Sequence, residues 1–182
     1  MAEFKAFSSD VEVNGETVLS VVNAMTGFEE YALNILAENG IKNPEPGKWY
    51  KQQNWLDAFK QISLKVGEKT LFNIGKAIPD NAQFPPEIDN IEKALSSIDV
   101  AYHMNHRGGE IGYYKLLEFY PGKKQATMEC KNPYPSHFDK GIIISMARKF
   151  KPEESTSVDV VLDESKPTRM KGSDSCTYII KW

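Results

Sequence analysis

The sequence is short of several features that mark special classes of protein. Its 182 residues include two cysteines, and 22 lysines and arginines against 25 aspartates and glutamates leave a net charge of −3. The longest local run of apolar residues, Gly141–Ile144, is far shorter than the roughly 18 residues that a membrane span requires. These shortages argue against a disulfide-stapled scaffold, a strongly basic nucleic-acid binder and a membrane-spanning protein.

The beginning of the chain also lacks a targeting signal. Met1–Lys5 contain neither the basic segment nor the apolar run of a secretory signal peptide, so we expect a cytoplasmic protein. In a reducing compartment, Cys130 and Cys176 are expected to be small buried hydrophobic residues. A disulfide, a shared metal and a reactive thiol are the alternatives.

Signatures of common enzymes are missing as well. The chain has no Gly-x-x-x-x-Gly-Lys phosphate loop, no Gly-x-Gly-x-x-Gly, no Gly-x-Ser-x-Gly, no His-Glu-x-x-His and no paired Cys-x-x-Cys. Carboxylates such as Asp139 and Asp174 have no evident catalytic partner in the sequence. We therefore expect a protein without catalytic turnover.

The length fits one domain, residues 1–182. The spacing of the apolar residues is typical of helices in some segments and of strands in others. Alternation on both sides of Asn14-Gly15 predicts an N-terminal β-hairpin. The other predicted elements are helices around 28–36, 55–66, 71–78 and 88–102, strands at 111–120 and 125–130, a helix at 138–150, and strands at 158–162 and 176–182. This order predicts an α+β fold, with the hairpin and helices packed on an antiparallel sheet.

Three helix starts are predicted from polar residues that cap helices. Thr26 stands three residues before Glu29, and Ser136 stands three before Asp139, which is the spacing of a capping box. Asn54 is the predicted cap of the helix that follows it.

The densest group of functional side chains is Ala-Tyr-His-Met-Asn-His-Arg-Gly-Gly at 101–109. His103 and His106 are three residues apart and occupy neighbouring positions on a helix surface. Imidazoles at this spacing can ligate iron or zinc. The alternative is that His103 packs beside Tyr102 and bonds to the backbone, while His106 and Arg107 end the helix. Because no cysteine or carboxylate joins them at metal-ligand spacing, we favour this alternative and expect no metal.

Asn132-Pro133-Tyr134-Pro135 predicts a corner between a strand and a helix. The two prolines fix their own backbone and extend the residues before them, which holds Tyr134 in one position. Tyr134 either fills this corner or reaches a ligand between the helices and the sheet.

The second half resembles a known superfamily. Met128-Glu129-Cys130, a Pro/Ser corner and then Gly141-Ile142-Ile143-Ile144-Ser145-Met146-Ala147 look like the strand–helix segment of heme nitric-oxide-binding (H-NOX) domains. This superfamily includes the 4-vinyl reductase-like ligand-binding domains and Golgi-transport subunits of the same fold. Residues 172–182 resemble the cysteine-bearing last strand of the 4-vinyl reductase-like branch. The resemblance covers about residues 86–182 and implies an H-NOX-like fold.

The resemblance also implies a heme site whose motif is altered here. It places the proximal heme histidine near His103, and the Tyr-x-Ser-x-Arg motif that grips the heme propionates on Cys130–Tyr134. Cys, Asn and Tyr stand there in place of Tyr, Ser and Arg, so the bidentate partner of two carboxylates is lost. Since poorly neutralised buried charges are costly, we expect no cofactor. A heme-based gas sensor with His103 as the iron ligand is the alternative.

Together these features predict a sensor-type domain that holds a small apolar or aromatic ligand between its helices and its sheet. The predicted binding residues are the polar groups Tyr102, His103, Cys130 and Tyr134 and the wall residues Phe72, Ile98, Met146 and Trp182. A separate partner would be needed to pass on a signal.

Two further alternatives remain open from the sequence. A non-catalytic module that forms homodimers through its helices would show exposed apolar residues on the Ile88–Ile98 helix. An enzyme or accessory protein of tetrapyrrole metabolism is implied only by the name of the family.

Overall fold

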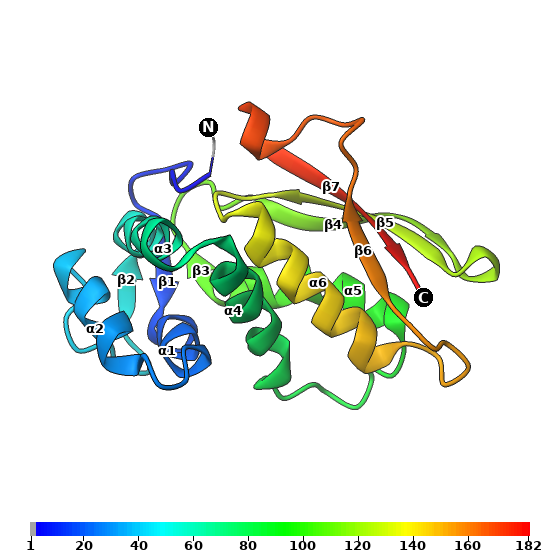
Figure 1. Cartoon of the computed structure of the whole chain (residues 1–182), viewed down its shortest axis with the longest axis horizontal. Helices are drawn as coiled ribbons and strands as arrows, with labels where there is room; N and C mark the ends of the chain where they lie inside the picture. The colour runs from blue at the N-terminus through cyan, green and yellow to red at the C-terminus, as the bar shows by residue number, and fades with distance from the viewer. Residues whose placement is uncertain (1–2) are drawn as a thin grey trace.

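The computed structural model describes residues 3–182, in which a group of helices joins an antiparallel sheet (Figure 1). The helices are α1 (Gly15–Ala24), α2 (Glu29–Glu38), α3 (Gln52–Val66), α4 (Glu68–Asp80), α5 (Ile91–Met104) and α6 (Ser136–Phe150), with short 3-10 turns η1 (Pro121–Lys123) and η2 (Arg169–Lys171). The strands are β1 (Glu12–Asn14), β2 (Trp49–Lys51), β3 (His106–Arg107), β4 (Tyr113–Tyr120), β5 (Gln125–Lys131), β6 (Asp159–Leu162) and β7 (Ser175–Lys181). None of these helices is long and apolar enough to cross a membrane.

The larger sheet has the strand order β4-β5-β7-β6, and every neighbouring pair is antiparallel. Alternate residues of its two central strands face the core, as the period of two requires. These residues are Ala126, Met128 and Cys130 on β5 and Cys176, Tyr178 and Ile180 on β7. Helices α5 and α6 lie along this face (Figure 1). The α+β fold predicted from the sequence is confirmed.

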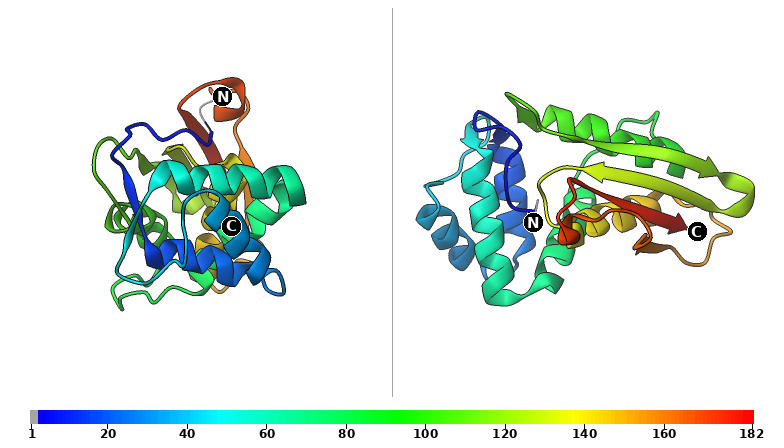
Figure 2. Two further views of the ribbon diagram at one scale, coloured as in Figure 1. Left: turned by 90° about the vertical axis from the view of Figure 1, so that its left-hand side faces the viewer. Right: turned by 90° about the horizontal axis from the view of Figure 1, so that it is seen from above.

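The first three helices gather at one end of the molecule with a small sheet of order β2-β1-β3. Figure 2 shows α3 running across the direction of the long strands. The hydrophobic core continues from this end into the space between α6 and the larger sheet.

Helices α4 and α6 cross in close contact, and two glycines make this possible. A Cβ on Gly75 would lie 2.1 Å from the carbonyl oxygen of Phe138, and one on Gly141 would lie 2.3 Å from that of Phe72. Since carbon atoms do not approach oxygen so closely, a larger residue at either position would push the helices apart. This crossing sets the distance between two walls of the cavity described below.

The predicted N-terminal hairpin is wrong beyond its first strand, because Asn14-Gly15 begins a helix. The Asn14 side chain accepts a hydrogen bond from the Thr17 backbone N–H (2.9 Å), which is an N-cap. A Cβ on Gly15 would lie 1.9 Å from the carbonyl oxygen of Glu45, so this glycine permits a close approach and does not form a turn. Strand β1 pairs instead with β2 and β3.

The predicted helices exist, but the predicted caps do not. Helix α2 has no side-chain cap from Thr26, and α3 begins at Gln52, before Asn54. At α6, Ser136 itself donates its backbone N–H to the Glu3 carboxylate (2.8 Å). The helix start is therefore capped by a residue 133 positions earlier, which no local pattern signals.

Candidate functional site

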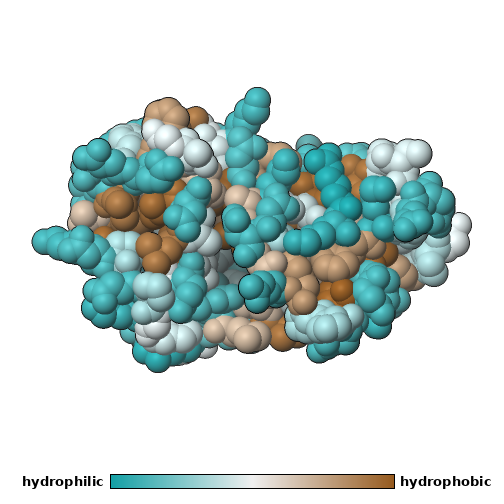
Figure 3. Space-filling view, turned by 90° about the horizontal axis from the view of Figure 1, so that it is seen from below, coloured by the Kyte–Doolittle hydropathy of each residue, from teal (hydrophilic) through white to brown (hydrophobic). Residues whose placement is uncertain are grey.

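A partly open cavity of about 120 Å³ lies between α4, α5 and α6 and reaches the rings of four buried aromatic residues. Its wall is almost entirely apolar. It is lined by Thr17, Ile78, Pro79, Ala82, Phe84, Ser97, Ile98, Ala101, Tyr102, Asn105, His106, Tyr114, Tyr134, Phe138, Ile142 and Met146. Figure 3, seen from below, shows a hollow with hydrophobic residues beside it.

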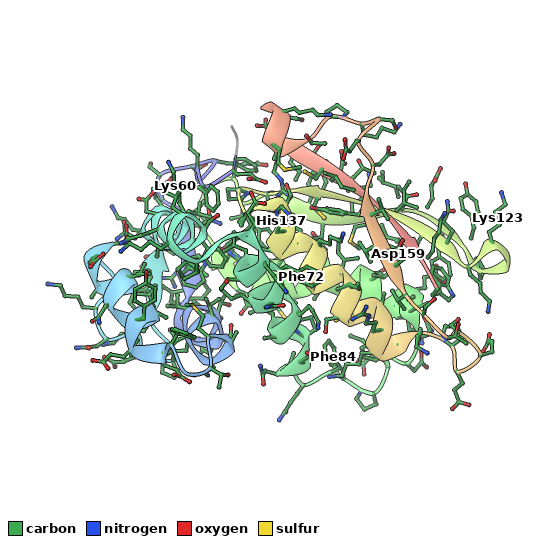
Figure 4. The ribbon with its side chains drawn as sticks, viewed as in Figure 1. Lys60, Phe72, Phe84, Lys123, His137 and Asp159 are labelled. Atoms are coloured by element: carbon green, nitrogen blue, oxygen red, sulfur yellow. The ribbon has the colours of Figure 1, made fainter. Side chains whose placement is uncertain are left out.

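The loop between α4 and α5 supplies part of the wall through Phe84. Its ring meets that of Phe150 edge to face with centroids 5.2 Å apart, and the Lys149 ammonium lies 4.8 Å from the Phe84 ring centre. Figure 4 places Phe84 between the C-terminal ends of α4 and α6. An aromatic side chain is thus fixed at this end of the cavity by contacts outside it.

His106 and Tyr134 form a neutral hydrogen-bonded pair in the cavity wall. Nδ1 of His106 lies 2.8 Å from the carbonyl oxygen of Tyr102, which only accepts, so Nδ1 carries the proton and donates. The Tyr134 hydroxyl, 2.7 Å from Nε2, then donates to that nitrogen. Burial lowers the pKa of His106 to about 4, so the imidazole is uncharged at neutral pH.

Tyr134 is held by the corner that the two prolines create. Its backbone N–H donates to the Asn132 side-chain oxygen (2.9 Å), and its ring contacts those of Phe59 and Phe138. Burial raises the pKa of the phenol of Tyr134. Tyr134 therefore stays protonated, as its bond to His106 requires.

A buried ionic cluster lies next to the cavity, on the side of the larger sheet. The Arg169 guanidinium, fully buried, donates to the Asp139 carboxylate and to the backbone oxygen of Asn132 (2.8 Å). The hydroxyl of Tyr114, a cavity-wall residue, donates to the same carboxylate (2.6 Å). Burial raises the pKa of Asp139, and the donors from Arg169, Tyr114 and Asn132 oppose that shift. Every contact on the carboxylate is a donor, which suits its charged form.

The structure brings four of the predicted binding residues to the cavity. Ile98 and Met146 belong to its apolar wall, and Tyr102 and Tyr134 face it with their rings. The Tyr102 hydroxyl is already bonded to the carbonyl oxygen of Ile111. All four residues lie on predicted helices or on the predicted corner.

The structure places the other four predicted residues elsewhere. Phe72 is half-buried on α4, where Figure 4 labels it, and does not line the cavity. Cys130 is fully buried opposite Cys176 within the sheet, and Trp182 stacks on Phe119 with ring centroids 5.3 Å apart. His103 has a side chain that is 49% exposed, and its Nδ1 lies 2.9 Å from the carbonyl oxygen of Asp99.

His106 is one of the cavity-wall residues that the sequence interpretation missed, since the favoured alternative had His106 only end the helix. The interpretation also missed Phe84, Tyr114, Phe138 and Ile142. The available signal for His106 was its distance of four residues from Tyr102, which places both on one face of a helical turn. His103, one position after Tyr102, points about 100° away. Within residues 3–182, no cluster of three or more His, Cys, Asp or Glu residues is arranged to hold a metal ion.

Sequence comparison finds no protein-family model and no curated protein that matches the chain. Comparison of folds does find relatives. An H-NOX protein from S. oneidensis in the Fe(II)NO ligation state superimposes with a TM-score of 0.67 at 12% identity, over 92% of this chain and 98% of that one. An oxygen-binding H-NOX domain related to soluble guanylate cyclases gives 0.65 at 14% identity, over 92% and 94%. The chain has the H-NOX fold. The resemblance noted in its second half therefore extends to the arrangement of almost the whole chain.

The H-NOX fold implies heme, but the residues of this cavity do not fit it. The volume of about 120 Å³ is well below the ~300–1,000 Å³ of pockets for larger ligands. No lysine or arginine in the described part of the chain lines the cavity to neutralise propionates, and Arg169 is already bound to Asp139 and Asn132. His103 faces solvent, and both ring nitrogens of His106 have partners.

Proposed function

We propose that this chain is a ligand-binding, sensor-type domain spanning residues 1–182 that takes a small, neutral, apolar or aromatic molecule into its cavity. The observation that carries the proposal is the nearly all-carbon wall around about 120 Å³. A cavity of roughly 150 Å³ with such a wall stays dry and binds benzene or xenon. A single aromatic ring therefore matches both the size and the chemistry of the space.

The polar groups of the wall favour a neutral ligand. The imidazole of His106 is uncharged, and it uses Nε2 to accept from Tyr134 and Nδ1 to donate to Tyr102. A carboxylate in this cavity would lose its hydration without gaining a cation, which is costly. We therefore expect benzene to bind and benzoate to be rejected. The proposal includes neither heme nor catalysis.

The homodimer alternative predicted exposed apolar residues between Ile88 and Ile98. Ile91, Leu95 and Ile98 are instead buried against the core. These three side chains are therefore not available for contact with a second copy of the chain.

The proposal is tested by calorimetric titration of the purified chain with benzene and with benzoate. We expect saturable binding of benzene alone, and its loss in Ile98→Phe, where the larger ring occupies the cavity. Val100→Phe is the matched control, because Val100 lies two residues along α5 and is 60% exposed. Benzene binding that survives Ile98→Phe, or is absent from the unmodified chain, would contradict the proposal.

A further inference from the structure

The loop between β6 and β7, residues 163–174, is anchored in the core by two neighbouring buried side chains, Thr168 and Arg169. Its turn η2 is closed by bonds within the loop, such as those from Lys171 N–H to Thr168 O (3.0 Å) and from Gly172 N–H to Arg169 O (3.0 Å). Figure 1 shows this segment beyond the start of β7, at the edge of the molecule. Arg169 leaves this surface loop and is fully buried.

The partners of Arg169 connect it to the cavity wall. Its guanidinium donates to Asp139, which also accepts from the Tyr114 hydroxyl, and to Asn132, which accepts from the Tyr134 backbone N–H. Tyr114 and Tyr134 both line the cavity. One hydrogen bond, from the ring hydroxyl of Tyr114 and from the backbone N–H of Tyr134, therefore joins each residue to a group that holds the loop.

The insertion of the loop is incompletely satisfied. Arg169 Nε and Thr168 Oγ1 are buried and have no hydrogen-bond partner within residues 3–182. Unsatisfied buried polar groups and the removal of a charge from water both weaken the inserted state. Local opening of this segment therefore costs less free energy than it would if these two atoms were paired.

From this arrangement we infer that occupancy of the cavity controls the docking of the 163–174 loop through Arg169, which makes this loop the element that reports bound ligand. This inference rests on the function proposed above. A ligand beside Tyr114 and Tyr134 removes the free space into which their rings can move. It thereby favours the geometry in which Asp139 and Asn132 hold Arg169, so the bound protein has a docked loop and the empty protein opens it more often.

Limited digestion with trypsin tests the inference, because trypsin cleaves after Arg169 only when that side chain leaves the core and enters the protease. Benzene at saturation is the probe, and its binding is measured separately by calorimetry. We expect benzene to slow cleavage after Arg169 by roughly fivefold or more, the lower end of typical coupling between sites. Cleavage after Lys60, on the distant helix α3, is the internal control and should change less.

Two variants separate this path from general stabilisation by the ligand. In Tyr114→Phe the ring remains but its bond to Asp139 is lost, so protection of Arg169 at equal benzene occupancy should largely disappear. In Tyr178→Phe, a buried hydroxyl bonded to Ser136 O (2.8 Å) is removed, and protection should persist.

The outcomes distinguish the two claims. If benzene binds but the cleavage rate after Arg169 is unchanged, or if Tyr114→Phe keeps full protection, the inference is wrong and the proposed function stands. If benzene does not bind at all, the proposed function fails and the inference falls with it.

Discussion

Two buried polar pairs are connected through Asn132 in this molecule, and they differ in charge and in packing. His106 and Tyr134 are neutral and face a cavity, whereas Asp139 and Arg169 are charged and packed on all sides. An uncharged pair can border empty apolar space at little cost, but an ion pair needs every surrounding donor and acceptor. The difference indicates that the neutral pair, His106 and Tyr134, faces the ligand. The ion pair, Asp139 and Arg169, holds the corner at residues 132–135 in place.

The largest effect should come from breaking the charged group. Arg169→Ala leaves the Asp139 carboxylate buried without its cation, and removing one partner of a buried pair costs about 3–5 kcal/mol. Urea denaturation measures this loss. Lys171→Ala, exposed in the same loop, should change the free energy of unfolding by less than about 0.5 kcal/mol. Equal effects of the two variants on the free energy of unfolding would show that the Asp139–Arg169 pair does not contribute to stability as expected.

The neutral pair should make the stability of the protein depend on pH, through His106. His106 binds a proton at a pKa of about 4 when folded and near 6.5 when unfolded, so between these values the unfolded state holds the extra proton. Stability is therefore complete above pH 6.5 and falls as the pH drops to 4, by about 3 kcal/mol.

Denaturation of the unmodified chain and of His106→Gln across this range isolates that part of the pH dependence. The variant should lose less stability on acidification than the parent does. Parallel curves for the two proteins would mean that His106 is not held neutral by burial.

A smaller loss of stability is expected when the Tyr134 hydroxyl is removed from the His106–Tyr134 pair. Tyr134→Phe keeps the ring but leaves Nε2 of His106 buried without a donor, which costs about 1–3 kcal/mol. The same substitution at Tyr120, whose side chain is exposed at the end of β4, is the control and should be nearly neutral. Thermal unfolding of both variants makes the comparison, and equal melting temperatures would argue against the hydrogen bond.

The smallest effect is predicted for the histidine that the sequence singled out. His103→Ala removes a half-exposed side chain, and its effect on stability should stay below about 0.5 kcal/mol. Benzene binding by this variant, measured by calorimetry, should equal that of the parent. A clear loss of benzene binding would show that His103 belongs to the binding site.

The sequence predicted the elements better than it predicted how they meet. Periodicity identified the helices and the long strands, because the core faces of α5, β5 and β7 follow regular spacing. It failed at Asn14-Gly15, where the glycine serves a contact with Glu45 on another segment.

The candidate site was predicted only where local sequence patterns mark it, and not where distant segments meet. Tyr102 and Tyr134 stood in unusual local motifs, but the pairing of His106 with Tyr134 joins residues 28 positions apart. The insertion of Arg169 beside Asp139 spans 30 positions, and no local pattern in the η2 loop announces a buried arginine. Contacts of this kind are set by tertiary packing and only the folded chain reveals them.

A crystal structure of the protein under xenon pressure tests the central claim most directly. Xenon occupies dry apolar cavities and has no polar group to bind elsewhere with specificity. The account predicts a xenon atom among Ile98, Ile142 and Met146, beside the rings of Tyr114 and Tyr134. A cavity that stays without xenon, or one filled by ordered waters bonded to His106, would contradict it.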